Sequence, residues 1–287
     1  MKMLSFGEIL WDVYPDAKTI GGASLNLAAH CALLGGDVYI ASAVGDDKLG
    51  KEALLVTRSF NIKDDFISVY NDKETGVVLV TLRSSGVPSY EIKKSVAYDY
   101  IKLPLINNAK FDVLAFGTLA LRGEHNKQTL SSLLRAYSFS EIYADLNIRL
   151  PHSTQKSAEL CLSNATIIKI SDEELPTVSD WIFSKEYAPK DFAIEISKRY
   201  KNLKLIIITK GDKGSIAYEV AGQLFYHSNA VPTKVISTVG AGDSFGAAFL
   251  TKHFAGEDIQ VSLDFASEVS SYVCSHKQAV PDISHFV

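Results

Sequence analysis

Short apolar runs of strand length recur along the sequence, and amphipathic segments of helical length separate them. The runs are apolar at consecutive positions, which is typical of strands that are buried on both faces of a sheet. Segments such as 26–34 and 126–137 have the apolar spacing of helices that connect such strands. The pattern predicts a layered α/β core with a mostly parallel sheet. The predicted strands are 4–10, 38–43, 113–116, 141–146, 166–170 and 205–209.

Two stretches depart from this alternation of strands and helices. Residues 76–93 read as two strand-like runs around a turn at 84–86, which predicts a β-hairpin. Residues 11–20 form a further extended piece that can pair with the hairpin. The two pieces, about 11–20 and 74–98, would then form a small β-sheet lid inserted in a single domain that spans 1–287. A surface ribbon with no role in binding is the alternative, and the sequence leaves both open.

Composition excludes several classes of protein. The 287 residues are 47% hydrophobic and 22% charged, and no segment approaches the roughly 20 apolar residues that span a bilayer, so disordered, coiled-coil and membrane-spanning classes drop out. A net charge of -4 gives no general attraction for nucleic acid or anionic lipid. Any phosphate that the protein binds must therefore be held by a local group of residues.

The cysteines and the N-terminus carry no signal for export. Cys31, Cys161 and Cys274 lie far apart and lack the spacing of a zinc site, so they are predicted to be reduced thiols. The first residues read directly as a strand and lack the apolar region of a signal peptide. A cytoplasmic location is the expectation.

The first glycine pattern, residues 45–51, fits the GxxxxGK part of a nucleotide-binding P-loop. Glu52 stands where a Ser or Thr hydroxyl should bind magnesium, and Asp46 and Asp47 would repel the phosphates. We therefore interpret these residues as a polar loop that caps the following helix.

The second pattern, residues 242–246, has the GxSxG form of a hydrolase nucleophile. Ser244 would be the nucleophile, and Asp264 and His276 follow in the order that an α/β-hydrolase requires. Only 43 residues, which look mainly helical, follow Ser244. They leave little room for the later strands that present the acid and the base, so a serine hydrolase is the minor alternative.

The third pattern runs from Gly240 to Asp243 and precedes a predicted helix of small and aromatic residues. Small residues at a helix start leave backbone N–H groups accessible to an anion, and the helix dipole adds positive potential. A carboxylate there binds phosphate poorly but can take a proton from an attacking hydroxyl. Asp243 is therefore predicted to be a catalytic base. An Asp that only stabilises the helix dipole is the alternative.

Together with segments 7–12, 21–26 and 209–214, residues 240–243 resemble the ribokinase-like (PfkB-type) sugar kinase family. The resemblance covers essentially the whole chain. It implies a three-layer α/β/α ribokinase-like core and the transfer of a phosphoryl group from ATP, accompanied by Mg²⁺, to a sugar hydroxyl. It assigns Asp243, Gly240, Ala241 and Gly242 to catalysis; Asp12, Gly21, Gly22, Asn26, Asp145 and Asn147 to the sugar; Thr209, Gly211, Gly214 and Lys169 to the nucleotide; and Glu174, through water, and Ser171 to magnesium.

The segment from Asp145 to Arg149 indicates a subtype. If it extends the preceding strand, a period of two places Asp145, Asn147 and Arg149 on one side at the strand's carboxyl end, where α/β sheets bind ligands. The DxNxR pattern resembles that of fructokinases and of 2-keto-3-deoxygluconate kinases. Fructose is therefore the expected substrate, and 2-keto-3-deoxygluconate or another sugar or nucleoside is the alternative. Arg149 is predicted to support substrate or phosphate charge, with a surface salt bridge as the alternative.

Two positions depart from the family pattern. Ser237 stands where the family usually has an Asp that helps to bind a monovalent cation, so potassium dependence is expected to be weak. Ser171 replaces the Asn of an NxxE motif, whereas Glu174 is kept. These departures leave open a non-catalytic sugar or nucleotide sensor. A homodimer that associates through the lid is a further expectation, because an exposed apolar sheet invites pairing.

Overall fold

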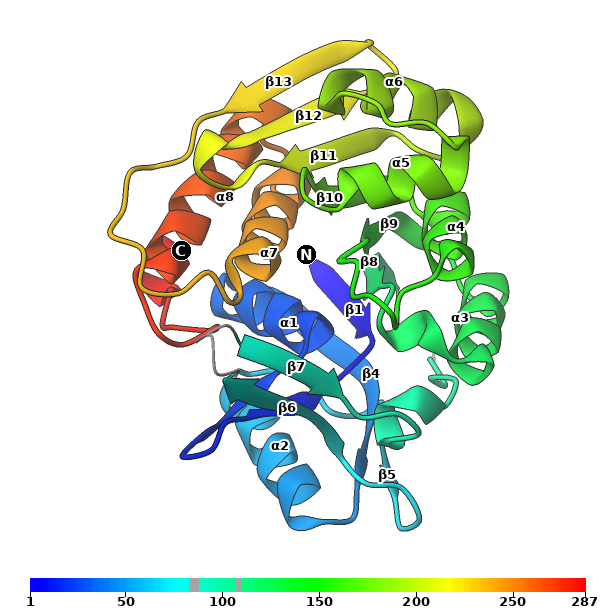
Figure 1. Cartoon of the computed structure of the whole chain (residues 1–287), viewed down its shortest axis with the longest axis vertical. Helices are drawn as coiled ribbons and strands as arrows, with labels where there is room; N and C mark the ends of the chain where they lie inside the picture. Colours follow the sequence, from blue (N-terminus) through cyan, green and yellow to red (C-terminus); the bar gives the residue numbers. More distant parts are fainter. Residues whose placement is uncertain (83–87, 107–109) are drawn as a thin grey trace.

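The computed structural model describes residues 1–82, 88–106 and 110–287. In that part of the chain, nine strands form a sheet in the order β13-β12-β11-β10-β9-β8-β1-β4-β5 (Figure 1). The strands from β11 to β5 are parallel, and β12 and β13 extend one edge in antiparallel pairing. The bounds are β1 Lys2–Phe6, β4 Asp37–Gly45, β5 Ile67–Tyr70, β8 Phe111–Gly117, β9 Phe139–Asp145, β10 Ile167–Ser171, β11 Leu205–Thr209, β12 Ser215–Glu219 and β13 Leu224–Ser228.

Helices cover both faces of this sheet and make three layers, as predicted (Figure 1). Successive side chains of one strand point to opposite faces of the sheet. Met3 of β1 packs with residues of α1, α7 and α8, whereas Leu4 packs with residues of α3 to α6. The helices are α1 Ala23–Leu33, α2 Lys48–Ser59, α3 Glu124–Ala136, α4 Gln155–Asn164, α5 Leu175–Phe183, α6 Pro189–Arg199, α7 Ala241–Phe254 and α8 Ile259–Cys274, with short 3-10 turns η1 Ala97–Tyr100, η2 Ala120–Arg122, η3 Gly211–Lys213 and η4 Ser284–Phe286.

A second sheet of four strands has the order β3-β2-β6-β7. The pairs β2–β3 and β6–β7 are antiparallel, whereas β2 and β6 run parallel. The predicted pairing of segments 11–20 and 76–93 is thus confirmed, although the predicted turn at 84–86 lies outside the described residues. We call this the small sheet; its strands are β2 Leu10–Val13, β3 Lys18–Gly21, β6 Gly76–Leu82 and β7 Pro88–Ile92.

The apolar run 4–10 is not one strand, which corrects the prediction. β1 ends at Phe6 in the large sheet, and β2 begins at Leu10 in the small sheet. The chain leaves the large sheet at Gly7, where a Cβ atom would lie 1.8 Å from the Ser24 hydroxyl oxygen. This close approach to the start of α1 places the connection between the two sheets directly beside that helix.

The polar loop at 45–51 caps α2, as the sequence indicated. The carboxylate of Asp47 accepts a hydrogen bond of 2.7 Å from the Gly50 amide. The same carboxylate accepts bonds from the amide and hydroxyl of Thr75, both at 2.8 Å. Asp47 therefore ties the start of α2 to the segment that leads into β6. In the described part of the chain, no helix is long and apolar enough to cross a membrane.

Candidate active site

Asp243 lies in the first turn of α7, which packs against α1. The side-chain amide nitrogen of Asn26, on α1, donates a hydrogen bond of 2.8 Å to Oδ2 of Asp243. Burial, and then the negative charge of Asp145, raise the pKa of Asp243 to about 7, against the lowering effects of Asn26, Lys169 and Arg149. A carboxyl group with that pKa can both accept and release a proton near neutral pH, which fits the predicted base.

The residues before Asp243 form a tight turn, at the place where the sequence predicts an anion site. Gly240 precedes α7 with φ of 82°, and a Cβ atom there would lie 2.3 Å from the Ala279 carbonyl oxygen. The Ala241 amide already donates to the Thr238 carbonyl at 3.2 Å. Among the described residues, the Gly242 amide has no such acceptor. Ala241 is thus less available to an anion than the sequence suggested, whereas the Gly242 amide is available to one.

A buried ion pair lies beneath this turn. Nζ of Lys169, on β10, lies 2.7 Å from Oδ2 of Asp145, at the end of β9, and the two side chains are 6% and 11% exposed. A Cβ atom on Gly242 would lie 3.2 Å from the same Lys169 nitrogen. The sequence assigned Asp145 to the sugar and Lys169 to the nucleotide, whereas the structure joins the two under the first turn of α7.

The small sheet contributes Asp12. This residue lies on β2, and a Cβ atom on Gly21 of β3 would come within 2.8 Å of its Oδ2. Gly22 follows with φ of 110°, and a Cβ atom there would lie 2.5 Å from the Glu8 carbonyl oxygen. The two glycines therefore leave room for the Asp12 carboxylate and for the turn into α1. Burial raises the pKa of Asp12, and the positive charge of Arg149 lowers it.

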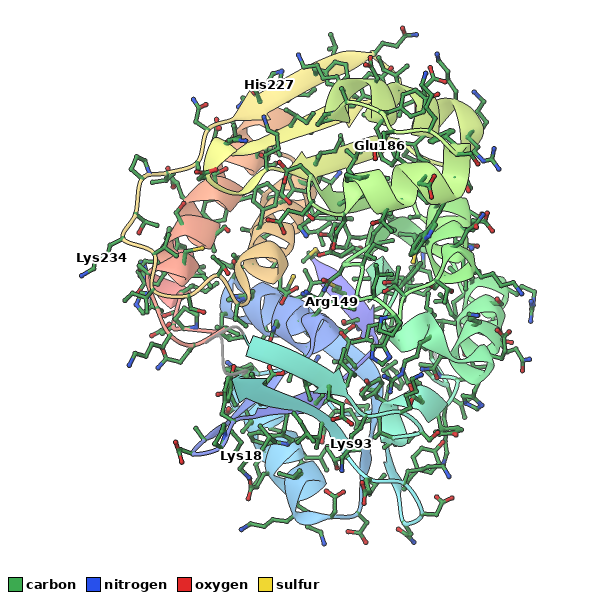
Figure 2. All side chains as sticks on the ribbon, viewed as in Figure 1. Lys18, Lys93, Arg149, Glu186, His227 and Lys234 are labelled. Carbon is green, nitrogen blue, oxygen red and sulfur yellow. The ribbon has the colours of Figure 1, made fainter. Side chains whose placement is uncertain are left out.

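The segment from Leu146 to Arg149 does not extend β9, which corrects the expected alternation. β9 ends at Asp145, and Asn147 has φ of 38°, outside the extended region. The chain turns because the Ile148 amide donates to Oε1 of Glu174 at 2.7 Å instead of to a neighbouring strand. Arg149 is nevertheless in the site: it lies near the middle of the molecule (Figure 2), and its charge lowers the pKa values of both Asp12 and Asp243.

Glu174 connects this segment to β10. Its other oxygen, Oε2, accepts a bond of 2.9 Å from the Ser171 amide, and the Ser171 hydroxyl accepts one of 3.3 Å from the Glu174 amide. Burial, and then the charge of Asp145, raise the pKa of Glu174. The buried Oδ1 of Asp145 has no hydrogen-bond partner among the described residues.

These carboxylates suit a magnesium ion that keeps its waters. No group of three or more His, Cys, Asp or Glu side chains in the described ranges converges closely enough to hold a metal ion directly. The unpartnered oxygen of Asp145 and the carboxylate oxygens of Glu174 can accept hydrogen bonds from metal-bound water. Ser171, whose hydroxyl bonds to the Glu174 amide, has less capacity for that role.

The predicted nucleotide segment lies at the carboxyl end of β11. Thr209 is the last residue of that strand, and the Lys210 amide donates to the Gly214 carbonyl at 2.8 Å, which closes a tight loop. Gly211 has φ of 55°, and a Cβ atom there would meet nothing within 4 Å. Gly214 has φ of 79°, and a Cβ atom there would lie 2.0 Å from the Ser228 carbonyl oxygen. Glycine is therefore required in the loop, and its surface at Gly211 is open.

The hydrolase alternative is wrong on geometry. Ser244 is buried within α7 and donates its hydroxyl proton to the Ala241 carbonyl at 3.0 Å. The Asp264 carboxylate bonds to Gln260, and Nδ1 of His276 faces the Tyr272 carbonyl at 2.8 Å. The three side chains are thus bonded within their own helices or turns and form no nucleophile–base–acid chain.

Ser237 has a local structural contact. Its hydroxyl oxygen accepts a bond of 3.2 Å from the Val239 amide, in the loop that leads to α7. A neutral hydroxyl in this place supplies no charge for a monovalent cation, so weak potassium dependence stays a prediction.

Sequence reasoning missed the part that Glu8 plays. Its buried carboxyl group accepts bonds from the amide and hydroxyl of Ser24, at 3.4 and 3.3 Å, and so caps the start of α1. The spacing of Glu8 before the Gly21–Gly22 pair carries no signal for this contact. The contact of Asn26 with Asp243 was equally hidden, since the two residues are 217 positions apart.

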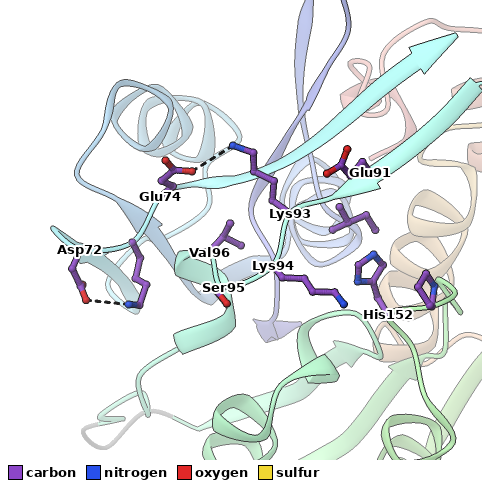
Figure 3. A pocket seen from close by; sticks show the side chains of 11 residues that line it. Asp72, Glu74, Glu91, Lys93, Lys94, Ser95, Val96 and His152 are labelled. Atoms are coloured by element: carbon purple, nitrogen blue, oxygen red, sulfur yellow. Dashed lines mark hydrogen bonds and ion pairs between the residues drawn. The ribbon is translucent and has the colours of Figure 1, made fainter.

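A cavity of about 620 Å³ lies beside the end of β7, and Asp243 is not among the residues that line it (Figure 3). The ion pairs Lys93–Glu74, at 3.4 Å, and Lys73–Asp72, at 3.1 Å, lie on its wall. Lys94 extends toward His152 in this view. A second cavity of about 340 Å³ shares both residues with the first. The chain beyond Arg149 therefore borders open space on the side of the small sheet.

Comparisons with solved structures support the fold. Fructokinase with bound ATP from Xylella fastidiosa superimposes with a TM-score of 0.86 at 18% identity, over 99% of this chain and 97% of that chain. Fructokinase from Vibrio cholerae O395, in a form with fructose, ADP and calcium ion bound, gives 0.84 at 19% identity, over 98% and 95%. The large sheet, the three layers and the small sheet thus have close counterparts in known sugar kinases.

Sequence relatives extend over most of the chain. Probable fructokinase-5 from Arabidopsis thaliana is 27% identical, over 97% of this chain and 93% of the relative. The 5-dehydro-2-deoxygluconokinase of Listeria innocua is 26% identical, over 90% and 82%. Residues 13–285 match the pfkB family carbohydrate kinases. With the buried Asp243 carboxyl group at the start of α7 and the glycine-rich turn before it, this match places the chain in the pfkB family of carbohydrate kinases.

Proposed function

We propose that the protein transfers the γ-phosphoryl group of ATP to a hydroxyl group of fructose. The observation that carries the proposal is the Asp243 carboxyl group, whose pKa of about 7 suits a base at neutral pH, placed directly after the Gly240–Gly242 turn. Fructokinases among the sequence relatives and the structural neighbours favour fructose, and the ATP-bound neighbour favours ATP.

In this proposal the acceptor hydroxyl lies between Asp12 and Asp243. Asp12 and Asn26 bind the sugar, and Asp243 takes the proton of the hydroxyl as it attacks the γ-phosphorus. The Gly242 amide and the buried Lys169 ammonium face the transferring phosphoryl group and stabilise its charge. Arg149, whose charge reaches both carboxylates, supports the negative charge that develops between them. Asn147 remains a proposed sugar contact.

The nucleotide lies across the open loop at Thr209, Gly211 and Gly214. Magnesium bound with ATP would draw charge from its phosphates. Asp145 and Glu174 would hold waters of that ion through their free lone pairs, and Ser171 holds Glu174 in place.

The choice of sugar is tested by the release of ADP in a coupled assay. We expect fructose to give the highest kcat/KM in a set with 5-dehydro-2-deoxygluconate, 2-keto-3-deoxygluconate, ribose and a nucleoside. The first of the two acids is included because the Listeria relatives are named for it. A preference for an acid would replace fructose but leave the kinase proposal intact, whereas sugar binding without any ADP release would support a sensor.

The role of the base is tested by Asp243→Asn. We expect ATP and fructose still to bind, while kcat falls by about 10²- to 10⁴-fold, the usual contribution of a general base. The matched control is Asp264→Asn, which changes an exposed carboxylate on α8 and should keep wild-type turnover. A variant at Asp243 that kept more than about a tenth of kcat would show that another group takes the proton.

Two statements about organisation also remain proposals. We propose that 1–287 acts as one kinase domain, with 11–20 and 74–98 as a lid over the sugar. Association of two copies through the small sheet is the proposed oligomer, because an exposed apolar sheet favours pairing with another chain.

A further inference from the structure

We infer that Asn26 is the positioning residue for Asp243: its amide holds one carboxylate oxygen, so that the other oxygen faces the acceptor hydroxyl. The inference rests on the proposed function, in which Asp243 is the base. The sequence suggested only that Asn26 binds the sugar. The same side chain also binds the base, Asp243.

The geometry gives Asn26 control over the direction of the carboxylate. Asn26 is buried at 5% exposure on α1, and its amide nitrogen lies 2.8 Å from Oδ2 of Asp243 on α7. Both residues stand on helices that pack against each other, so the contact is fixed by two rigid elements. Without that bond, the carboxylate could adopt other orientations about its terminal side-chain bond, whose torsion is broad. The bond to Asn26 selects one orientation.

The other end of the Asn26 amide is free. Its buried Oδ1 atom has no hydrogen-bond partner among the described residues. A buried acceptor without a donor costs free energy, so a bound molecule that supplies an O–H group is favoured there. A sugar hydroxyl next to the one that reacts would supply that donor. Asn26 would then bind base and sugar through opposite ends of one planar group.

The charged and titratable groups that face Asp243 come from β9, β10 and the loop after β9. Asp145 at the end of β9 raises the pKa of Asp243, whereas Lys169 on β10 and Arg149 in the loop after β9 lower it. The Tyr143 phenol, buried on β9, is within electrostatic reach of the same carboxylate. Asn26 on α1 is the uncharged member of this set and donates directly to the carboxylate. Removing Asn26 therefore changes the base without changing the charge of the site.

The test is the pH dependence of kcat/KM in Asn26→Ala and Asn26→Asp. Wild type should lose activity as the pH falls through about 7, where Asp243 becomes protonated. In Asn26→Ala the Asp243 carboxylate loses a hydrogen-bond donor, so the fall in activity should begin at a higher pH than in wild type. The kcat at pH 7 should fall by about 10- to 100-fold. Asn26→Asp keeps the shape of the side chain but replaces the donor with a negative charge. The pH at which its activity falls should therefore be higher still. KM for ATP should change by less than about threefold in both.

The matched control is Asn202→Ala, which removes an amide that bonds to the Leu162 and Ala165 carbonyls away from the site. It should lower the melting temperature and leave the pH profile in place. If the Asn26 variants raised only KM for fructose and left the pH at which activity falls unchanged, Asn26 would be a sugar ligand alone and the inference would be wrong. If Asp243→Asn itself kept its activity, the proposed base would fail first, and the inference with it.

Discussion

Two demands on the Asp243 side chain oppose each other. A general base that works at neutral pH needs a pKa near 7. Burial, together with the charge of Asp145, raises the pKa of Asp243 to about 7. The same burial disfavours the charged form, so the folded protein is less stable whenever Asp243 is ionised. Asn26, Lys169 and Arg149 offset part of that cost without removing it. Activity and stability therefore depend on the same few contacts.

The stability of Asp243→Asn should reveal that cost. The folded-state pKa of about 7 lies above the ordinary value of 3.8. Wild type therefore loses stability as the pH rises from about 4 to 7, and the loss is constant at higher pH. The variant cannot ionise, so at pH 8 it should be more stable by on the order of 1–3 kcal/mol, and the difference should vanish near pH 4.

Thermal melts without ligand at pH 4 to 8 measure this difference. Asp282→Asn is the control, because the Asp282 carboxylate is exposed and accepts a bond from the Ser284 amide, which lowers its pKa. That substitution should give a pH trend of the opposite sign. An Asp243→Asn variant that melted below wild type at pH 8 would mean that the ionised carboxylate stabilises the fold.

The elements that carry the site are the first turns of α1 and α7. Gly22 precedes α1 and Gly240 precedes α7, each with a positive φ, and in each case a Cβ atom would meet a backbone oxygen. Glycine alone adopts this conformation at little cost. The two turns bring Asn26 and Asp243 together because their helices start at the same edge of the large sheet. The glycines are thus part of the site's geometry, besides any contact with ligands.

Gly22→Ala should be damaging for this reason. The added Cβ atom would lie 2.5 Å from the Glu8 carbonyl oxygen, at a φ of 110°. We expect a loss of about 2–4 kcal/mol in the free energy of unfolding, measured by urea titration, together with a lower kcat. Gly123→Ala is the matched control: Gly123 also precedes a helix, but it has φ of -104° and open space around it. A loss below about 1 kcal/mol is expected there, and equal losses at the two positions would contradict the argument.

At the scale of elements, the sequence predicted most of the large sheet and both small-sheet segments. Buried parallel strands are apolar throughout, and this signal located β4, β8, β10 and β11. This signal predicted one strand where there are two, because the apolar run 4–10 passes from the large sheet to the small sheet at Gly7. The whole run is buried, so hydrophobicity alone does not reveal the break between the two strands. The period-two alternation expected after Asp145 is also absent, because a carboxylate distant in sequence, that of Glu174, accepts the hydrogen bond of the Ile148 amide. Contacts of this kind depend on the finished fold.

At the scale of the whole molecule, the site is divided between two sheets. Asp12 belongs to the small sheet, whereas Asp145, Lys169 and Asp243 belong to the large sheet and its helices. The motifs of the sequence identified most of these residues but assigned each to one ligand. The structure shows shared contacts instead: Lys169 with Asp145, and Asn26 with Asp243. Such pairs join positions too far apart for spacing to reveal.

Hydrogen exchange should separate the two halves of the site. We expect fructose to slow amide exchange in β2 and β3, which carry Asp12 and Gly21, because the sugar links the small sheet to the core. A non-hydrolysable ATP analogue should slow exchange in 209–214 and leave β2 unchanged. α3, which carries none of the proposed ligands, is the internal control. Protection of the small sheet by the nucleotide alone would show that the sheet belongs to the nucleotide site.

The distance of 217 residues between Asn26 and Asp243 also orders the events of biosynthesis. At the usual speed of translation, the ribosome adds that length of chain in roughly 10–45 s, and through this time Asn26 has no partner. β1 likewise waits for β8, its neighbour in the large sheet. A product that ends before α7 lacks both Asp243 and the helix against which α1 packs, so this part of the site is completed only after α7 has been made.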